Sequence, residues 1–441
     1  MHPNNRTCVL SRHIFPIFCI LLATFQPTDF TAAQEKEVRT DKFRQLEELL
    51  PTPNERRTAS GAPGPAYWQQ RADYVIEVAI DENSHRVSGS ETITYTNNSP
   101  HELSYLWLQL DPNLFSKHSF TPLTDEAPEI DRISYKGLKG LLYRSEFDGS
   151  ITISSVKDTD GKDLPRTIVK TMMRVDLPKP LASGKAMSFS VAWSFSLVDL
   201  KKIRARSGQE VLDDGNAIYS VAQWYPRMCA YTDVHGWRHR QYIGGGEFTL
   251  EFGSFLVKIT VPEDHIVAST GTLQNPAEVL TAPQRERLTA AAGAEKPVLI
   301  VTPEEAGENR KSRAKGKKTW IFHADMVRDF AFASSRSFAW DAMPSAGEGF
   351  STLCMSFYPA EAMPLWNRYA THATAQAIEV YSKHTVPYPW PVAISVNSPV
   401  GGMEYPMLHF TGARPEKDGT YSERKKHGMI SVIIHEVGHN W

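Results

Sequence analysis

Cysteine is scarce in this sequence, with four residues in 441. Two of them, Cys8 and Cys19, lie in an N-terminal segment, 1–33, that we expect to be removed on export. The remaining pair, Cys229 and Cys354, cannot form a disulfide framework, although a single bridge between them stays open. A core of this size can supply stability without a cross-link, so we expect two buried free thiols.

An excess of charge of either sign is also missing. The 48 lysines and arginines nearly balance 50 aspartates and glutamates, so no overall field attracts nucleic acid or an anionic membrane. The basic run 310–318 lies in a polar stretch, 276–318, and lacks interleaved aromatic residues, which favours a solvated surface insertion over a polyanion site. We therefore expect no nucleic-acid partner.

Long apolar runs are absent except for one, at 14–23. Basic residues precede this run at Arg6 and Arg12, and small residues follow it at 31–33, which is the layout of a secretory signal peptide. A bilayer-spanning helix needs about 20 apolar residues, so cleavage is favoured over a membrane anchor. The sequence predicts export to the periplasm or the extracellular space, with no stable membrane anchor after signal cleavage.

The hydrophobic residues, 41% of the chain, fall into patterns that divide the rest of the sequence. A short helix and a linker are expected at 34–66, where apolar residues at helical spacing precede a stretch rich in proline, glycine and alanine. Alternating apolar residues such as those at 74–80 then predict half-buried strands. With turn residues between the strands, they indicate a β-rich domain over 67–345, with a polar insertion at about 276–318.

The region 346–441 mixes strand and helix patterns. Strands are expected at 352–358 and 392–396, and helices at about 360–383 and 423–441. The last helical pattern reaches the final residue without a cap or stop signal, which indicates a truncated chain. The predicted fold class is a β-rich N-terminal domain followed by an incomplete α/β domain.

The last expected helix contains the sequence His435-Glu436-Val437-Gly438-His439, an HExxH motif. Residues four apart lie on one helical face, so both imidazoles can reach one zinc ion while Glu436 flanks it as a general base. The surrounding apolar residues predict a helix buried nearly all round, in which these polar groups need the compensation that a bound metal supplies. The alternative is a pair of core histidines satisfied by hydrogen bonds.

A second feature is the sequence Gly401-Gly402-Met403-Glu404, in which Glu404 precedes His435 by 31 positions. Two glycines let a backbone approach a ligand closely, and the adjacent carboxylate could pair with a cation held there. Taken alone, the pattern fits a glycine-marked strand end with a surface glutamate better.

Together these two motifs resemble those of the aminopeptidase N family of gluzincin zinc metallopeptidases, in which a GxMEN-type motif precedes HExxH by some thirty residues. The likeness includes the segments 223–227, 246–248 and 329–335, and it covers roughly 67–441. It implies an exported bacterial member of the family. Its fold would be a β-rich N-terminal domain followed by the start of a thermolysin-like α/β metallopeptidase domain.

By this resemblance, His435 and His439 are ligands of one Zn²⁺ per chain, and Glu436 is the base and proton shuttle. Glu404 anchors the free α-amine of a peptide substrate. The other residues implied to bind substrate are Gly401, Gly402 and Met403, which would line the peptide backbone as an edge strand, and Gln223, which would approach from the β-rich domain.

Two departures accompany the resemblance. The family's usual asparagine after the motif glutamate is Tyr405 here. The third zinc ligand, a glutamate about nineteen residues after the second histidine in gluzincins, would fall beyond Trp441 together with a catalytic tyrosine. A catalytic zinc takes three protein ligands, so we expect the 441-residue chain to be inactive by itself.

Three functions therefore stay open for the full-length protein. The first is a zinc aminopeptidase, and the second is a zinc endopeptidase of the same fold in which Glu404 captures no amine. The third is a binding module attached to an inactive metallopeptidase-like domain. Free and N-blocked peptides separate the first two. If no glutamate follows His439 near the expected spacing, both catalytic hypotheses lose their third zinc ligand.

Overall fold

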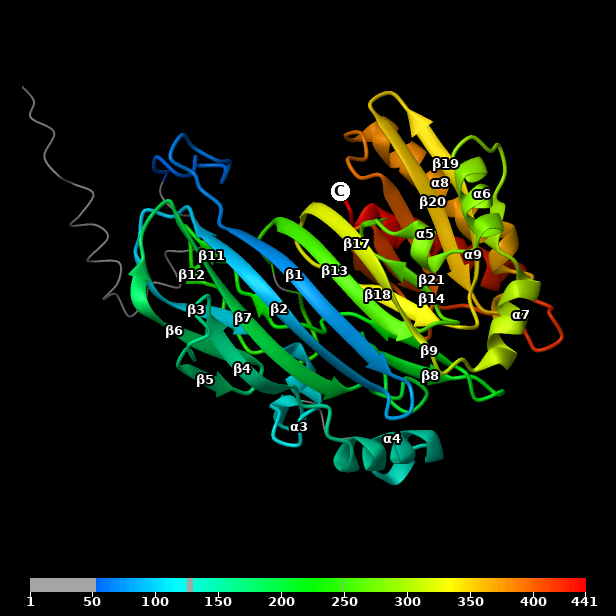
Figure 1. Ribbon diagram of the computed structural model, residues 1–441, viewed down its shortest axis with the longest axis horizontal. Coiled ribbons are helices and arrows are strands. Elements are labelled where there is room, and N and C mark those ends of the chain that lie inside the picture. The colour runs from blue at the N-terminus through cyan, green and yellow to red at the C-terminus, as the bar shows by residue number, and fades with distance from the viewer. Residues whose placement is uncertain (1–52, 125–129, 248) are drawn as a thin grey trace, which may run out of the picture. The chain divides into compact units, whose positions relative to one another are not determined.

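The computed structural model describes residues 53–124, 130–247 and 249–441 (Figure 1). The predicted signal peptide and the helix predicted before Pro51 lie outside the described residues. The chain divides into two units, Met1–Tyr67 and Trp68–Trp441. In the described part of the first unit, Arg57 and Pro63 form an isolated antiparallel bridge, so this stretch is a folded-back linker rather than an extended one.

The β-rich part is built around a sheet whose strands bury alternate residues. In β1 (Arg71–Asp81), every second side chain from Ala72 to Ile80 is buried, because successive side chains of a strand point to opposite faces. Within the described residues this sheet has the order β15-β17-β13-β1-β2-β7-β4, and only β1 and β13 pair in parallel (Figure 1). Its other strands are β2 (Arg86–Asn97), β4 (Thr152–Asp158), β7 (Lys185–Ser196), β13 (Gly253–Pro262), β15 (Thr272–Leu273) and β17 (Lys317–Val327).

Smaller sheets complete the β-rich part. Two of them have the orders β10-β3-β6-β5 and β14-β18-β9-β8 in the described chain, and β11 pairs with β12. The strands are β3 (Leu103–Gln109), β5 (Arg166–Val169), β6 (Met172–Leu181), β8 (Gly208–Val211), β9 (Ala217–Val221), β10 (Arg227–Met228), β11 (Tyr231–Thr232), β12 (Gly236–Trp237), β14 (Ile266–Ser269) and β18 (Phe332–Ser335). Because Gln223 lies between β9 and β10, these sheets set its position.

The α/β part is a mixed sheet with the order β16-β19-β20-β21-β23-β22 among the described strands. Its strands are β16 (Val298–Val301), β19 (Ala339–Gly347), β20 (Phe350–Tyr358), β21 (Val392–Asn397), β22 (Met403–Tyr405) and β23 (Leu408–Thr411). Two long helices, α8 (Trp366–His384) and α9 (Glu423–Gly438), pack against each other and against this sheet (Figure 1). Ile378 of α8 and Ile433 of α9 belong to one fully buried cluster, which fixes α9 over the sheet.

The remaining helices of the described residues are short. They are η1 (Asp111–Phe115), α3 (Thr121–Thr124), η2 (Ile130–Arg132), α4 (Tyr135–Glu146), α5 (Pro276–Val279), α6 (Ala282–Ala291), α7 (Pro303–Ser312) and η3 (Ala360–Ala362). Capping boxes begin α6 and α7, where Thr281 and Thr302 each satisfy a backbone amide three residues on. None of the helices in the described part combines the length and the apolar character needed to cross a bilayer.

The polar stretch 276–318 is more than the solvated insertion expected from its composition. Its strand β16 pairs with β19 and so joins the α/β sheet, and Ile300 and Val301 are fully buried. The composition of the stretch did not predict this strand, because a short buried strand hardly alters the composition of a long polar segment. Of the cations of α7, Lys311 is exposed, whereas Arg310 is half-buried and pairs with Asp214 and Glu361.

Two other expectations are confirmed. The predicted fold class, a β-rich part followed by an α/β part, is the architecture that the structure shows. Cys229 and Cys354 are both buried and unpaired. The expected domain boundaries stay predictions, and β19, which spans residue 346, is shared across one of them.

Candidate active site

Helix α9 carries the HExxH motif, and its start is set by local hydrogen bonding. The hydroxyl of Ser422 accepts a hydrogen bond from the backbone N–H of Lys425 at 3.2 Å, and Glu423 places negative charge at the positive end of the helix. At the other end, a Cβ on Gly438 would lie 2.8 Å from the hydroxyl of Tyr381 in α8. Glycine at this position therefore lets the two helices approach closely beside His439.

The prediction that this helix is buried nearly all round was wrong. Met429, Ile433 and Val437 face the core, but His435 and His439 lie on an exposed face. Apolar composition predicted burial without saying which face is buried, whereas packing against α8 and β23 covers only one side in the described residues. The exposed face leaves both imidazoles open to a ligand.

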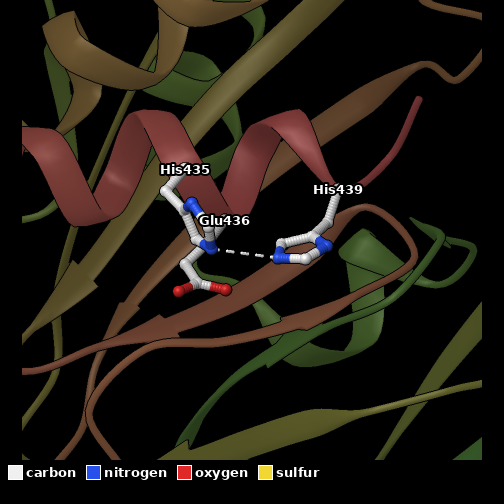
Figure 2. A group of neighbouring side chains, drawn as sticks. All are labelled: His435, Glu436 and His439. Atoms are coloured by element: carbon white, nitrogen blue, oxygen red, sulfur yellow. Dashed lines mark hydrogen bonds between the residues drawn. The ribbon is translucent and has the colours of Figure 1, made fainter. Parts of the chain in front are cut away.

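The two histidines face each other from successive turns of α9 (Figure 2). Their Nε2 atoms are 3.1 Å apart, and the two rings are nearly perpendicular. Two nitrogen ligands of a tetrahedral zinc ion, each about 2.0–2.1 Å from it, would be about 3.3 Å apart. The pair is therefore spaced like two zinc ligands. With Glu436 they form the one possible metal-binding group found in the described part of the chain, with ligand atoms within 4.8 Å of one another.

The side chain of Glu436 is buried, with 5% of its surface exposed. Its Oε2 atom has no hydrogen-bond partner among the described residues. Burial first, and the nearby Glu404 carboxylate second, raise the pKa of Glu436 to about 7. A water would satisfy the orphaned oxygen, and a cation nearby would stabilise the charged form. The residues present therefore fit two ligands of a zinc ion with a carboxylate beside them.

Glu404 lies beside this centre, on the edge strand β22. Its Oε1 atom is 3.9 Å from Nδ1 of His439, the ring nitrogen that faces away from His435. Burial raises the pKa of Glu404, and a hydrogen bond with the Glu247 carboxyl raises it further. Met403 precedes Glu404 on the same strand, which pairs with β23 on one side only in the described sheet. A free strand edge can pair with an extended peptide.

The two glycines before β22 each have a steric reason. Gly401 has a positive φ of 98°, which other residues rarely adopt. At Gly402, a Cβ would collide with Oε1 of Glu436 and lie 3.2 Å from Val432. The first glycine therefore shapes the turn, and the second leaves room for the carboxylate of Glu436.

We expect Gly402→Ala in the full-length protein to lower kcat by about 10- to 100-fold, because a displacement of about 1 Å at a reacting group can cost 10²-fold. The obstructing atom is the end of a flexible side chain, so the melting temperature should change little. The matched control is Gly428→Ala in α9, the helix that carries Glu436, where a Cβ meets nothing within 4 Å. Equal activity in the two variants, measured by steady-state kinetics, would contradict the steric role of Gly402.

Sequence reasoning missed a third glutamate at this site. Glu247 lies before β13, which begins at Gly253. Glu247 follows a turn in which Gly244 and Gly246 have positive φ, and it pairs with Arg206 at 3.3 Å. The run of three glycines before an acid was the available signal, since it is typical of a turn rather than a strand.

Gln223 lies at the border of this group. Its Oε1 accepts a hydrogen bond from the Tyr242 hydroxyl at 3.4 Å, and it lines a small cavity of about 30 Å³ together with Arg206. Arg206 in turn pairs with Glu247. Arg206 thus lies between Gln223, with which it lines the cavity, and Glu247, with which it pairs. The contact of Gln223 with substrate stays a prediction.

No protein-family model matches the chain, and no curated protein matches it. Solved structures do. The M1 zinc metallopeptidase from Deinococcus radiodurans and a point mutant of it are each 15% identical to the chain, with a TM-score of 0.47, over 86% of this chain and 66% of theirs. A two-domain M1 zinc metallopeptidase mutant bound to L-tryptophan is 14% identical, with a TM-score of 0.48 and the same coverage.

These solved structures are zinc metallopeptidases. The chain spans 66% of the length of each. Identities and TM-scores this low carry no argument about activity. The function is therefore argued from the side chains of the site itself.

Proposed function

We propose that the full-length protein is a zinc-dependent aminopeptidase that hydrolyses the N-terminal peptide bond of peptides. The observation that carries the proposal is the convergence of Glu404 with the HExxH group, where Oε1 of Glu404 lies 3.9 Å from Nδ1 of His439. An HExxH group alone suits many hydrolytic reactions. A carboxylate beside it, at an open strand edge, favours a peptide that carries positive charge next to the bond to be cut.

His435 and His439 would hold the zinc ion, one per chain. A bound zinc ion supplies Lewis-acid polarisation and lowers the pKa of water to near neutrality. A catalytic zinc needs a third protein ligand, and the one implied by the family resemblance is a glutamate further along the full-length chain. That ligand stays a prediction.

The chain's own residues would divide the remaining work. Glu436 would accept a proton from the attacking water, whose oxygen bonds to the peptide carbonyl carbon. As the carbon–nitrogen bond breaks, Glu436 would return that proton to the leaving amine. Glu404 would pair with the α-ammonium group of the substrate, and the backbone of Gly401, Gly402 and Met403 would align the peptide along β22.

The substrates would be peptides with a free N-terminus. We also propose that the protein acts outside the cytoplasm, in the periplasm or the extracellular space. Support for this location is the signal-peptide pattern of 1–33, which lies outside the described residues.

The test of this function is Glu404→Gln in the full-length protein. Losing a partly buried ion pair costs about 2–5 kcal/mol, so kcat/KM on free-amine peptides should fall by roughly 1.5 to more than 3 orders of magnitude. N-acetylated peptides cannot form the pair, so they should be poor substrates of the parent and become little worse. Zinc content, measured by elemental analysis, should not change.

A matched control is Glu416→Gln. Glu416 is an exposed acid that pairs with Lys425, and Glu416 lies outside both motifs in the sequence. It should leave both substrates unaffected. If Glu404→Gln instead slows free and N-acetylated peptides equally, Glu404 is structural or catalytic and not an amine anchor. The endopeptidase hypothesis would then replace the aminopeptidase.

A further inference from the structure

The turn that follows Glu404 is held by contacts from three other segments of the chain. It consists of Pro406 and Met407 and joins β22 to β23. Met407 is buried and has a positive φ of 62°, and its carbonyl accepts a hydrogen bond from the backbone N–H of Ile394 at 2.8 Å. On the other side, the hydroxyl of Thr270 donates to the carbonyl of Pro406 at 2.9 Å, which ties the turn to the β-rich part.

The third contact comes from Asn440, the residue directly after His439. The backbone N–H of Met407 donates to Oδ1 of Asn440 at 3.0 Å. The amide nitrogen Nδ2 of Asn440 donates to the carbonyl of Val437 at 3.3 Å. Since one partner is an N–H and the other a carbonyl, only one orientation of the amide satisfies both. The side chain thus bridges the end of α9 and the turn after Glu404.

This bridge matters because its contact with the turn adds to those of Ile394 and Thr270 in fixing the short strand β22. It is a strand of three residues at the edge of the sheet, and it pairs with β23 alone among the described strands. An edge strand this short gains few ladder hydrogen bonds. Glu404 must nevertheless keep its position relative to His439, since a shift of about 1 Å can cost 10²-fold in rate.

We propose that Asn440 is a positioning residue that holds the Glu404 strand in register with the metal-binding histidines. Its side chain hydrogen-bonds to Met407 and Val437, and through Met407 it acts on β22, which ends at Tyr405 directly before the turn. The inference rests on the proposed function and deepens it. It explains how an amine anchor on the sheet and two ligands on a helix act on the same peptide bond.

Two variants separate positioning from simple capping of the helix. Asn440→Ala removes both hydrogen bonds, whereas Asn440→Asp keeps the acceptor for Met407 and loses the donor to Val437. If Asn440 only caps α9, the two variants should behave alike. If it positions Glu404, the aspartate variant should rescue the function of the site, even where its negative charge at the helix C-terminus lowers the melting temperature.

The first readout is the ratio of kcat/KM for a free-amine peptide to that for its N-acetylated counterpart, measured on zinc-loaded full-length protein. Asn440→Ala should lower this ratio by about tenfold, mainly through KM of the free-amine peptide, and Asn440→Asp by less than about threefold. In a Glu404→Gln background, Asn440→Ala should not lower the ratio further. The inference would be overturned if Asn440→Ala lowered kcat/KM equally for both peptides. It would also be overturned if Asn440→Ala still lowered the ratio by about tenfold in the Glu404→Gln background.

The second readout does not depend on peptidase activity. Hydrogen exchange of the turn amides, followed by mass spectrometry, should be faster by about tenfold in Asn440→Ala and close to the parent in Asn440→Asp. Unchanged exchange in Asn440→Ala overturns the positioning role even if the protein prefers free amines. If exchange is faster in Asn440→Ala but the protein does not prefer free amines, the positioning role of Asn440 is retained and the aminopeptidase proposal is rejected.

Discussion

Full-length protein with Glu436→Gln is expected to keep its zinc and to lose nearly all turnover. Glutamine preserves the shape of the side chain but cannot accept a proton, and general base catalysis typically contributes about 10²–10⁴-fold. The position of Glu436 supports the large end of this range, because its buried Oε2 has no protein partner among the described residues. Single-turnover rates and elemental analysis of zinc give the two measurements.

The control for this variant is Glu423→Gln in the first turn of the same helix. Glu423 is exposed and pairs with Lys426 at 2.5 Å, far along the helix from the histidines. It should retain full turnover. If Glu436→Gln keeps more than about a tenth of the parent's turnover, another group acts as the base and the mechanism proposed above is wrong.

His435→Ala and His439→Ala are each expected to abolish stoichiometric zinc and, with it, activity. A catalytic zinc site has three protein ligands, and removing one opens the ion to water and to loss on dialysis. Both histidines lie on the exposed face of α9, and alanine is the stronger helix former, so the variants should fold as the parent does. The zinc content after dialysis, measured by elemental analysis, should fall from about one ion per chain to a small fraction of an ion per chain.

The matched control is His427→Ala, because His427 lies on the same helix and is exposed but outside the motif. Its zinc content should equal that of the parent. Unchanged metal in both motif variants would refute the assignment of His435 and His439 as ligands. Loss of metal in the His427 variant as well would point to a general effect on α9 and not to coordination.

Part of this site could be predicted from the sequence because it is local. The two histidines are four positions apart, so helical geometry places them on one face, where their Nε2 atoms lie 3.1 Å apart. Glu404 was assigned through the family resemblance, since no periodicity links it to His439. Glu247 and Arg206 were missed, because their pairing depends on how a glycine-rich turn of the β-rich part folds toward the α/β part.

The fold shows the same division. Period-two alternation predicted the strands of the β-rich part, as in β1, and helical spacing predicted the existence of α8 and α9. The end of α8 and the start of α9 were close to those expected, whereas α8 begins at Trp366 and not at about residue 360. Strand partners were not predictable, and the small strand β16 was missed inside a polar stretch. Pairing joins residues that are far apart in the chain, so no local pattern specifies it.

By itself, the sequence determined the types of side chain that carry the chemistry and the helix that sets two of them one turn apart, because both are properties of neighbouring residues. Only the tertiary structure decided which face of α9 stays open, that β22 lies at a sheet edge beside it, and that Asn440 ties the two together. The physical reason is that burial and hydrogen bonding between distant segments depend on packing, which fixes Glu404 at 3.9 Å from His439 although 35 positions separate them.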